Sequence, residues 1–229
     1  MKTICLFDLD GTLTDPFEGI SKAFAYSLDY FGVPMPEPES LKKYIGPPLR
    51  ESFTDFVPHE SIEDAVAKFR EYYATTGLLE NRLYDGIAEL LLKLKTEGFT
   101  LAVATSKVME YAGIIINHFG IGEYFDYIAG CELDGTRSAK SEVIEHALDV
   151  LKPDNNITVV MIGDRKHDIV GAKAMGALSI GITWGYGTRE ELTEAGATWI
   201  ANTPEEVYEV LNTTPHHNTS TITQPPCHN

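Results

Sequence analysis

The sequence predicts an α/β fold, a doubly wound parallel sheet with a small helical cap domain inserted after its first strand. Two observations support this prediction. Short apolar runs of strand length alternate with segments whose apolar residues recur at helical spacing, which indicates parallel strands covered by helices on both faces. Near the N-terminus, residues 16–82 interrupt this alternation and show helical patterns without any run of strand type.

The expected strands are short apolar runs that are rich in β-branched residues or flanked by them. The strong runs are 3–7 (TICLF), 99–104 (FTLAVA), 157–162 (ITVVMI) and 178–182 (LSIGI), and the weaker runs are 125–130 and 198–201. Helical patterns between them cover 87–98, 140–151 and 168–177. Gly98 ends the first of these helices and Pro153 stops the second, as is usual at helix ends.

The interrupting segment has the pattern of a helical insertion. Its helical stretches lie at 17–32, 40–45 and 60–77, with prolines between them. We therefore expect a core domain of residues 1–15 and 82–212, with a cap domain of residues 16–81 between its two parts. Residues 213–229 have almost no large apolar residues and many Thr, Pro, Asn and His, which predicts a disordered tail.

Charge and composition narrow the function classes. The 229 residues include 18 Lys and Arg against 34 Asp and Glu, a net charge of −16. This balance argues against binding to nucleic acid or to an anionic membrane surface, whereas a bound metal ion can still reverse the local field for an anionic small substrate. The N-terminal apolar run is too short for a signal peptide, no run has membrane length, and three scattered cysteines indicate no disulfide framework. We expect a cytoplasmic protein, either a monomer or a homodimer.

Polar residues of a specific kind follow three of the strong runs. They are Asp8 and Asp10 after the first run, Thr105, Ser106 and Lys107 after the second, and Asp164 and Asp168 after the third. Ligands bind beyond the carboxyl ends of the strands in open parallel sheets, so these side chains should meet in one crevice. Lys140, at the start of a helix, can reach the same crevice, and Arg137 is its competitor for that place.

The two carboxylates at Asp8 and Asp10 repel each other and are costly to bury, so something must compensate them. Carboxylate oxygens at a strand edge suit Mg²⁺, which also keeps waters and takes phosphate oxygens as ligands. A hydroxyl and an ammonium opposite the metal ion would hold the other oxygens of a bound phosphate. The pattern therefore predicts a phosphate site with Mg²⁺ as cofactor.

Four segments in this order resemble the motifs of the haloacid dehalogenase (HAD) superfamily. DLDGTLTD (8–15) resembles motif one, Thr105 motif two, Lys140 motif three, and GDRKHD (163–168) motif four. The resemblance extends over roughly residues 2–211 and includes the helical cap. The overall pattern of the chain is similar to that of phosphoglycolate phosphatase-like hydrolases, some of which act as 5′-nucleotidases.

The resemblance implies a role for each matching residue. Asp8 would be the nucleophile that forms an aspartyl-phosphate, and Asp10 the general acid and then the base that activates water. Mg²⁺ would be held by the Asp8 carboxylate, the Asp10 backbone carbonyl and Asp164. Asp168 would position waters on the metal ion or pair with Lys140.

The remaining matches concern the phosphate and the rest of the substrate. Thr105 and the Ser106 amide would bind phosphate oxygens, and Lys140 would neutralise Asp8 and the transferred phosphoryl group. In the cap, Arg50 follows a Gly-Pro-Pro loop and could read a second anionic group of the substrate. The alternative for Arg50 is a surface ion pair with Glu51 or Asp55.

The leading hypothesis is a Mg²⁺-dependent phosphatase that acts on a small phosphorylated metabolite. A phosphomutase of the β-phosphoglucomutase type shares all four motifs and stays open as an alternative. Haloacid dehalogenation is disfavoured because that branch lacks the second aspartate, which is present here as Asp10. From a different class, a non-catalytic phospho-aspartate signalling or binding module would also cluster acids, a hydroxyl and a lysine, but Asp10 and the cap argue against it.

Overall fold

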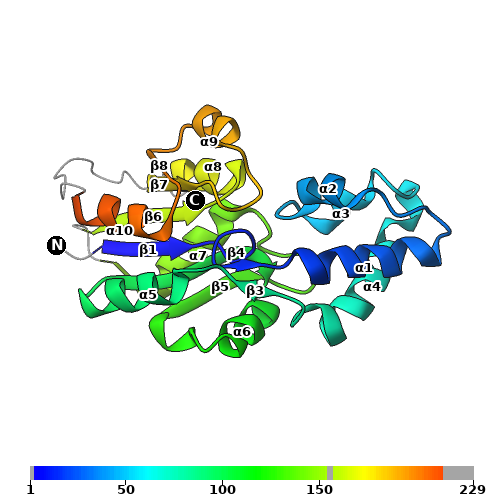
Figure 1. Ribbon diagram of the computed structural model, residues 1–229, viewed down its shortest axis with the longest axis horizontal. Helices are drawn as coiled ribbons and strands as arrows, with labels where there is room; N and C mark the ends of the chain where they lie inside the picture. The colour runs from blue at the N-terminus through cyan, green and yellow to red at the C-terminus, as the bar shows by residue number, and fades with distance from the viewer. Residues whose placement is uncertain (1–2, 154–156, 214–229) are drawn as a thin grey trace, which may run out of the picture.

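A parallel sheet forms the centre of the computed structural model, which describes residues 3–153 and 157–213 (Figure 1). In these residues the sheet has six strands in the order β5-β4-β1-β6-β7-β8. The strands are β1 (Thr3–Phe7), β4 (Thr100–Val108), β5 (Tyr127–Cys131), β6 (Thr158–Gly163), β7 (Leu178–Ile182) and β8 (Trp199–Ala201). All six expected runs are strands, and the predicted doubly wound fold is confirmed.

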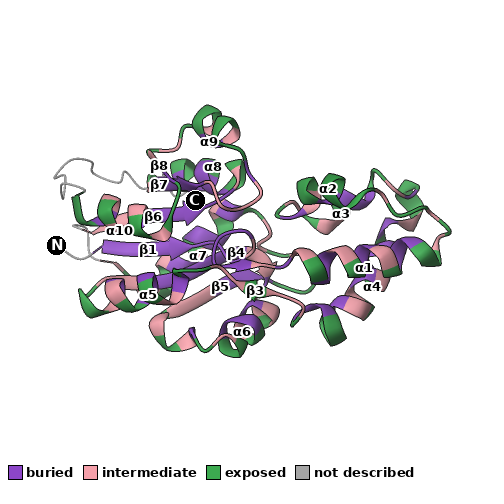
Figure 2. Ribbon diagram, in the orientation of Figure 1, coloured by how far each residue is buried: buried purple, intermediate pink, exposed green. Residues whose placement is uncertain are grey.

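Helices cover both faces of the sheet. Alternate residues of β1 point to opposite faces, with Ile4 and Leu6 on one side and Cys5 and Phe7 on the other. The first side packs against α7 (Lys140–Leu151) and α8 (Lys166–Ala174), and the second against α5 (Ile87–Thr96), α6 (Met109–His118) and α10 (Pro204–Thr213). Because both faces are covered, β1 is buried along its whole length and β4, β6 and β7 along most of theirs, whereas the edge strands β5 and β8 are partly exposed (Figure 2).

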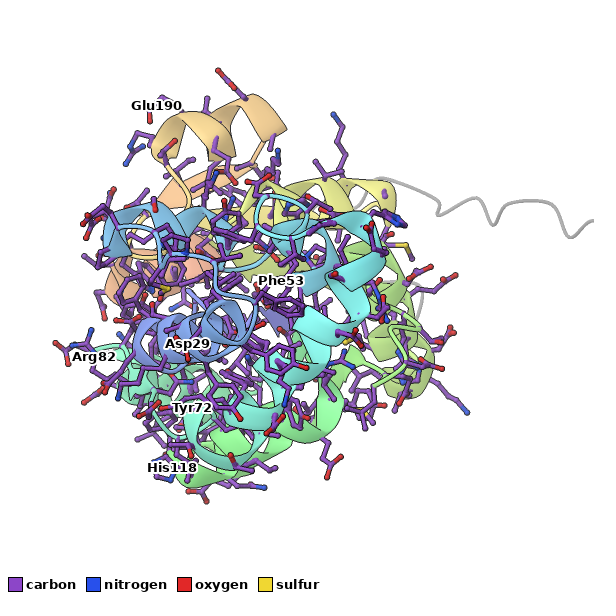
Figure 3. The ribbon with its side chains drawn as sticks, turned by 90° about the vertical axis from the view of Figure 1, so that its right-hand side faces the viewer. Asp29, Phe53, Tyr72, Arg82, His118 and Glu190 are labelled. Atoms are coloured by element: carbon purple, nitrogen blue, oxygen red, sulfur yellow. The ribbon has the colours of Figure 1, made fainter. Side chains whose placement is uncertain are left out.

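The predicted helical insertion stands beyond the carboxyl ends of the strands, and we call residues 16–81 the cap (Figure 1). Its elements are α1 (Phe17–Tyr30), α2 (Pro38–Leu41), η1 (Lys42–Tyr44), α3 (Leu49–Phe53), η2 (His59–Ser61), α4 (Ile62–Tyr72) and the π-helical turn η3 (Tyr73–Gly77). Phe24 forms the centre of its apolar interior, with ring centroids 5.0 Å from Phe53 and 5.2 Å from Phe69. The view onto the cap end shows where Phe53 lies among the side chains of the cap (Figure 3).

A short antiparallel ribbon joins the cap to the core. It consists of β2 (Thr14–Asp15) and β3 (Arg82–Leu83), and an Arg82–Asp15 ion pair links its strands. Sequence reasoning missed this ribbon, because strands of two residues leave no periodic signal. It coincides with the two expected joins of the cap to the core, although the domain boundaries at 15/16 and 81/82 remain a prediction.

Other differences concern element ends. β4 continues through residues 105–107 to Val108, with a register shift between Ala104 and Val108, so the polar residues lie in the strand and not after it. Helices α6, α10 and α9 (Arg189–Ala195) were not predicted individually. Thr213 belongs to α10, which corrects the expected start of the tail, and residues 214–229 lie outside the described part.

No helix among the described residues is long and apolar enough to cross a membrane.

Candidate active site

The central strand of the sheet carries the predicted nucleophile. The Asp8 backbone N–H donates to the Ile162 carbonyl at 2.9 Å, which extends the pairing of β1 with β6 by one residue and places Asp8 at the tip. Asp164 follows the end of β6, and Asp168 lies in the first turn of α8. All three carboxylates are buried, and one oxygen of each lies within 4.8 Å of the others.

Burial makes this cluster hard to ionise. It raises the pKa of Asp164 well above the usual range, and the neighbouring Asp168 and Asp8 add to the increase. Burial also raises the pKa of Asp168, to about 6, although Lys140 acts in the opposite direction. Three oxygen ligands whose charges are under-compensated are the donor set that a hard divalent cation suits, so the site fits Mg²⁺.

Lys140 is the cation that the protein itself supplies. Its Nζ lies 2.9 Å from Asp8 Oδ1 and 2.8 Å from Asp168 Oδ1, and it donates to the Ala104 carbonyl at 2.9 Å. Its side chain is 4% exposed, and burial alone would lower its pKa, but the charges of Asp168 and Asp8 raise it above the usual value. Arg137 binds the Gly130 carbonyl instead, so the structure brings Lys140 and not Arg137 to the carboxylates.

The Asp164 carboxylate lies between two loops. Its Oδ2 accepts from the Tyr186 N–H at 2.7 Å, and its carboxylate lies directly against Gly11. A Cβ at Gly11 would stand 2.3 Å from Asp164 Oδ2, and the positive φ of 84° also requires glycine there. The Trp184 indole N–H donates to the Thr12 carbonyl at 3.0 Å, which ties the 184–186 loop to the first motif.

Asp10 lies outside this cluster of carboxylates. Its Oδ2 pairs with Lys107 Nζ at 2.6 Å, and its side chain is 12% exposed. Burial raises the pKa of Asp10, and Lys107 opposes the increase. Thr105 is buried, and its hydroxyl accepts from the Lys107 N–H at 3.2 Å. Ser106 lies beside it, on the wall of the same cavity.

A cavity of about 330 Å³ lies between the core edge and the cap. The core side of its wall contains Asp8, Asp10, Thr105, Ser106 and Lys107, and the cap side contains Tyr44, Arg50, Phe69, Arg70 and Tyr73, among others. The structure therefore brings Asp8, Asp10, Thr105, Ser106 and the predicted cap residue Arg50 to one pocket. Lys140 and Asp168 contact Asp8 or each other behind this wall and do not line it.

Arg50 lines this pocket, but its ion pair was predicted wrongly. Its Nε and an Nη donate to the Glu63 carboxylate at 2.6 and 3.0 Å, in place of Glu51 or Asp55. Glu63 lies in the first turn of α4, which packs against α3, a neighbour that sequence spacing does not reveal.

Sequence reasoning also missed Arg70 and Tyr73 and assigned no role to Lys107. Arg70 donates to the Leu133 carbonyl at 3.0 Å, so a cap residue contacts a core loop there. For Lys107 the signal was its place directly after Thr105 and Ser106. Arg70 and Tyr73 stood in an ordinary helical pattern, which gave no indication of a site.

A family model for haloacid dehalogenase-like hydrolases matches residues 5–182. The chain belongs to this family, as its four motifs predicted, and it is a hydrolase of the phosphatase type. Relatives named 5′-nucleotidase and phosphoglycolate phosphatase agree with the predicted resemblance.

Individual relatives cover most of the chain. A 5′-nucleotidase of Pseudomonas aeruginosa is 44% identical over 191 residues, which are 82% of this chain and 85% of the relative. The tyrosine-protein kinase PtkA of Mycobacterium tuberculosis is 41% identical over 210 residues, 91% of this chain and 72% of the relative. The crystal structure of a predicted phosphatase from Clostridium acetobutylicum superimposes with a TM-score of 0.88 at 42% identity and covers 93% of this chain and 99% of that one.

Proposed function

We propose that the protein hydrolyses small phosphomonoesters with Mg²⁺ as cofactor, through an aspartyl-phosphate formed on Asp8. The observation that carries this proposal is the setting of Asp8. It stands at the tip of the central strand, against Lys140 and two further buried carboxylates, and it lines a cavity that the cap covers.

The contacts of Asp8 suggest which of its oxygens attacks. Lys140 Nζ lies 2.9 Å from Oδ1, and the Leu9 N–H donates to the same atom at 2.8 Å. Both donors occupy Oδ1, so we assign Oδ2 as the oxygen that forms the bond to phosphorus. Lys140 at the same time neutralises Asp8, which lowers the repulsion between this carboxylate and an incoming phosphate dianion.

Proton transfer falls to Asp10. In the first step its carboxyl group gives a proton to the ester oxygen while the bond from that oxygen to phosphorus breaks. In the second step its carboxylate takes a proton from water as the water attacks the aspartyl-phosphate and frees Asp8. The Thr105 hydroxyl and the Ser106 N–H would hold the phosphoryl oxygens in both steps.

Mg²⁺ fits beside these groups. The Asp8 and Asp164 carboxylates and the Asp10 backbone carbonyl would hold the ion, and Asp168 would orient its ligands while pairing with Lys140. The bound ion would supply positive charge that stabilises the phosphoryl oxygens and offsets the cluster of acids.

The cavity suggests the class of ester. Its cap wall combines aromatic side chains with the guanidinium groups of Arg50 and Arg70, and its volume of about 330 Å³ exceeds the needs of a two-carbon acid phosphate. Aromatic faces and arginines suit a planar heteroaromatic group and an additional polar or anionic group. We therefore favour a nucleoside monophosphate over phosphoglycolate, in line with the relative named 5′-nucleotidase.

The test is a phosphate-release screen over phosphorylated metabolites with Mg²⁺, run beside Asp8→Asn. We expect release by the wild-type protein, strongest for nucleoside monophosphates, and loss of release by the variant to the level without enzyme. Release that the variant retains, or no release from any ester, would contradict the proposal.

The same assay separates the other candidates. A phosphomutase would convert a sugar phosphate into its isomer without releasing an equivalent of phosphate. A tyrosine kinase, the activity in the name of the relative PtkA, would move the phosphoryl group from ATP to a protein hydroxyl. A signalling or binding module would retain the phosphoryl group on Asp8 without turnover. Mass spectrometry of the protein and of the products distinguishes these outcomes from hydrolysis.

A further inference from the structure

The Asp10 carboxylate depends on a single side chain for its position. Among the described residues, Lys107 is the hydrogen-bonding and ion-pair partner of Asp10 Oδ2, at 2.6 Å. The other oxygen, Oδ1, is buried and has no hydrogen-bond partner in the described part of the chain. A group that must exchange protons with the substrate therefore has one anchor.

The pair is poorly explained as a device for stability. The side chains of Lys107 and Asp10 are 8% and 12% exposed, so both charges are largely removed from water. Removing such a pair from water costs about as much as its attraction returns, and an apolar pair of the same volume is often as stable or more stable. This cost points to a task for the pair beyond holding the fold together.

Lys107 is in turn held by the cap. Its Nζ donates to the Tyr73 hydroxyl at 2.7 Å and lies 4.6 Å from the centroid of the Tyr73 ring. Tyr73 begins η3, is 3% exposed and stacks on Phe69 of α4 at 5.4 Å between ring centroids. The chain of contacts from Asp10 through Lys107 therefore ends in the packed interior of the cap.

We propose that Lys107 is the positioning residue for Asp10, and that Tyr73 completes this arrangement from the cap, so that the proton-transfer group is set in place by the seated cap. The inference rests on the proposed function, because it assigns Asp10 the transfer of a proton to the ester oxygen. In that step the proton leaves the Asp10 carboxyl group, the bond from phosphorus to the ester oxygen breaks, and the bond from Asp8 to phosphorus forms.

A difference between leaving groups tests this positioning. An alkyl phosphate needs the proton because its alkoxide is a poor leaving group, whereas p-nitrophenolate leaves without one. Lys107→Met should lower kcat/KM about 10- to 100-fold for an alkyl phosphate and less than about threefold for p-nitrophenyl phosphate. The parameter kcat/KM is chosen because it reports the steps up to loss of the leaving group.

Tyr73→Phe provides the milder variant, which removes one hydroxyl and keeps the ring. It should lower the alkyl-to-aryl ratio of kcat/KM in the same direction, by about two- to fivefold, as expected for the loss of one hydrogen bond to a charged group. The matched control is Lys93→Met. Lys93 lies 3.3 Å from the Tyr208 ring centroid and pairs with Glu205 on the far side of the core, so the ratio should not change.

A second readout follows the base step. When Asp10 is poorly placed, hydrolysis of the aspartyl-phosphate slows, so the variants should show a burst of p-nitrophenolate before the steady state. Equal loss of kcat/KM on both esters in Lys107→Met and Tyr73→Phe would assign the two residues a structural role and overturn the inference. A wild-type protein that releases phosphate from neither ester would instead overturn the proposed function.

Discussion

The core edge and the cap wall of the cavity differ in how far their charged groups are buried and in what holds them. At the core edge the functional charges are buried or nearly so and pair with one another, as Lys140 does with Asp8 and Asp168. The cap wall is largely apolar, with the aromatic rings of Tyr44, Phe69 and Tyr73, and its Arg50 is 45% exposed and held by an exposed carboxylate. The difference indicates that the core edge sets the chemistry at phosphorus, while the cap wall can change its contacts to suit the rest of the substrate.

Lys140→Met provides the strongest test of the role of the core edge in the chemistry at phosphorus. The substitution removes the ammonium that pairs with Asp8, so we expect kcat to fall by ~10²–10⁴-fold on every substrate, with the ranking of substrates unchanged. It also leaves two buried carboxylates without their partner, at a cost of about 3–5 kcal/mol in the free energy of unfolding. Steady-state kinetics and urea titrations measure the two effects.

Lys173→Met is the matched control for this variant, because Lys173 is an exposed lysine of the neighbouring α8. Its kinetics and stability should stay at the wild-type values. A changed ranking of substrates in Lys140→Met would show that the core edge also selects the substrate. It would contradict the division of roles between the core edge and the cap wall.

Addition of Mg²⁺ probes the same edge without a substitution. The ion should raise the melting temperature, with about 2.7 kcal/mol gained at a hundredfold excess over its dissociation constant. The raised pKa of Asp164 and Asp168 means that the metal-free folded state retains protons that the unfolded state loses, so its stability falls as pH rises from the ordinary value of 3.8 through about 6 for Asp168. Because Mg²⁺ displaces these protons, its stabilising effect should grow over the same range.

Differential scanning fluorimetry at several pH values, with and without Mg²⁺, measures this shift. Asp164→Asn removes one ligand and should abolish most of it. A shift that is independent of pH, or that is equal in Asp164→Asn, would show that the ion acts elsewhere on this acidic chain.

Arg50→Ala and Arg70→Ala test the cap wall and should have the smallest effect. Each should lower kcat/KM about tenfold for a substrate with a second anionic or polar group, the equivalent of one hydrogen bond to a charged group, and much less for p-nitrophenyl phosphate. Arg189→Ala is the control, because Arg189 binds Asn202 on the core surface. Equal losses on both esters would assign these arginines a role in holding the cap closed.

The residues that sequence reasoning recovered share one property. Thr105 lies in a strand, and Asp8 and Asp164 directly follow strands, whose burial shows as apolar runs, so their places at one edge of the sheet follow from the pattern. Lys140 follows from its position at the start of a helix. The residues that sequence reasoning missed make contacts between segments distant in the chain. Tyr73 and Lys107, for example, share a hydrogen bond and are 34 residues apart. A helical pattern shows which face is buried and not which partner lies against it.

The sequence by itself determined the sheet, the place of the helical insertion, three motifs at the ends of strands and the fourth, Lys140, at the start of a helix. Local periodicity and the ends of strands and helices are encoded in neighbouring residues. Tertiary structure alone decided that Asp10 is bound by Lys107, that Tyr73 reaches this pair from the cap, and that Glu63 holds Arg50. The Asp10–Lys107 pair forms within the core and the Arg50–Glu63 pair within the cap, whereas the Tyr73 contact depends on how the cap seats on the core. That placement results from packing between distant segments, which no local pattern encodes.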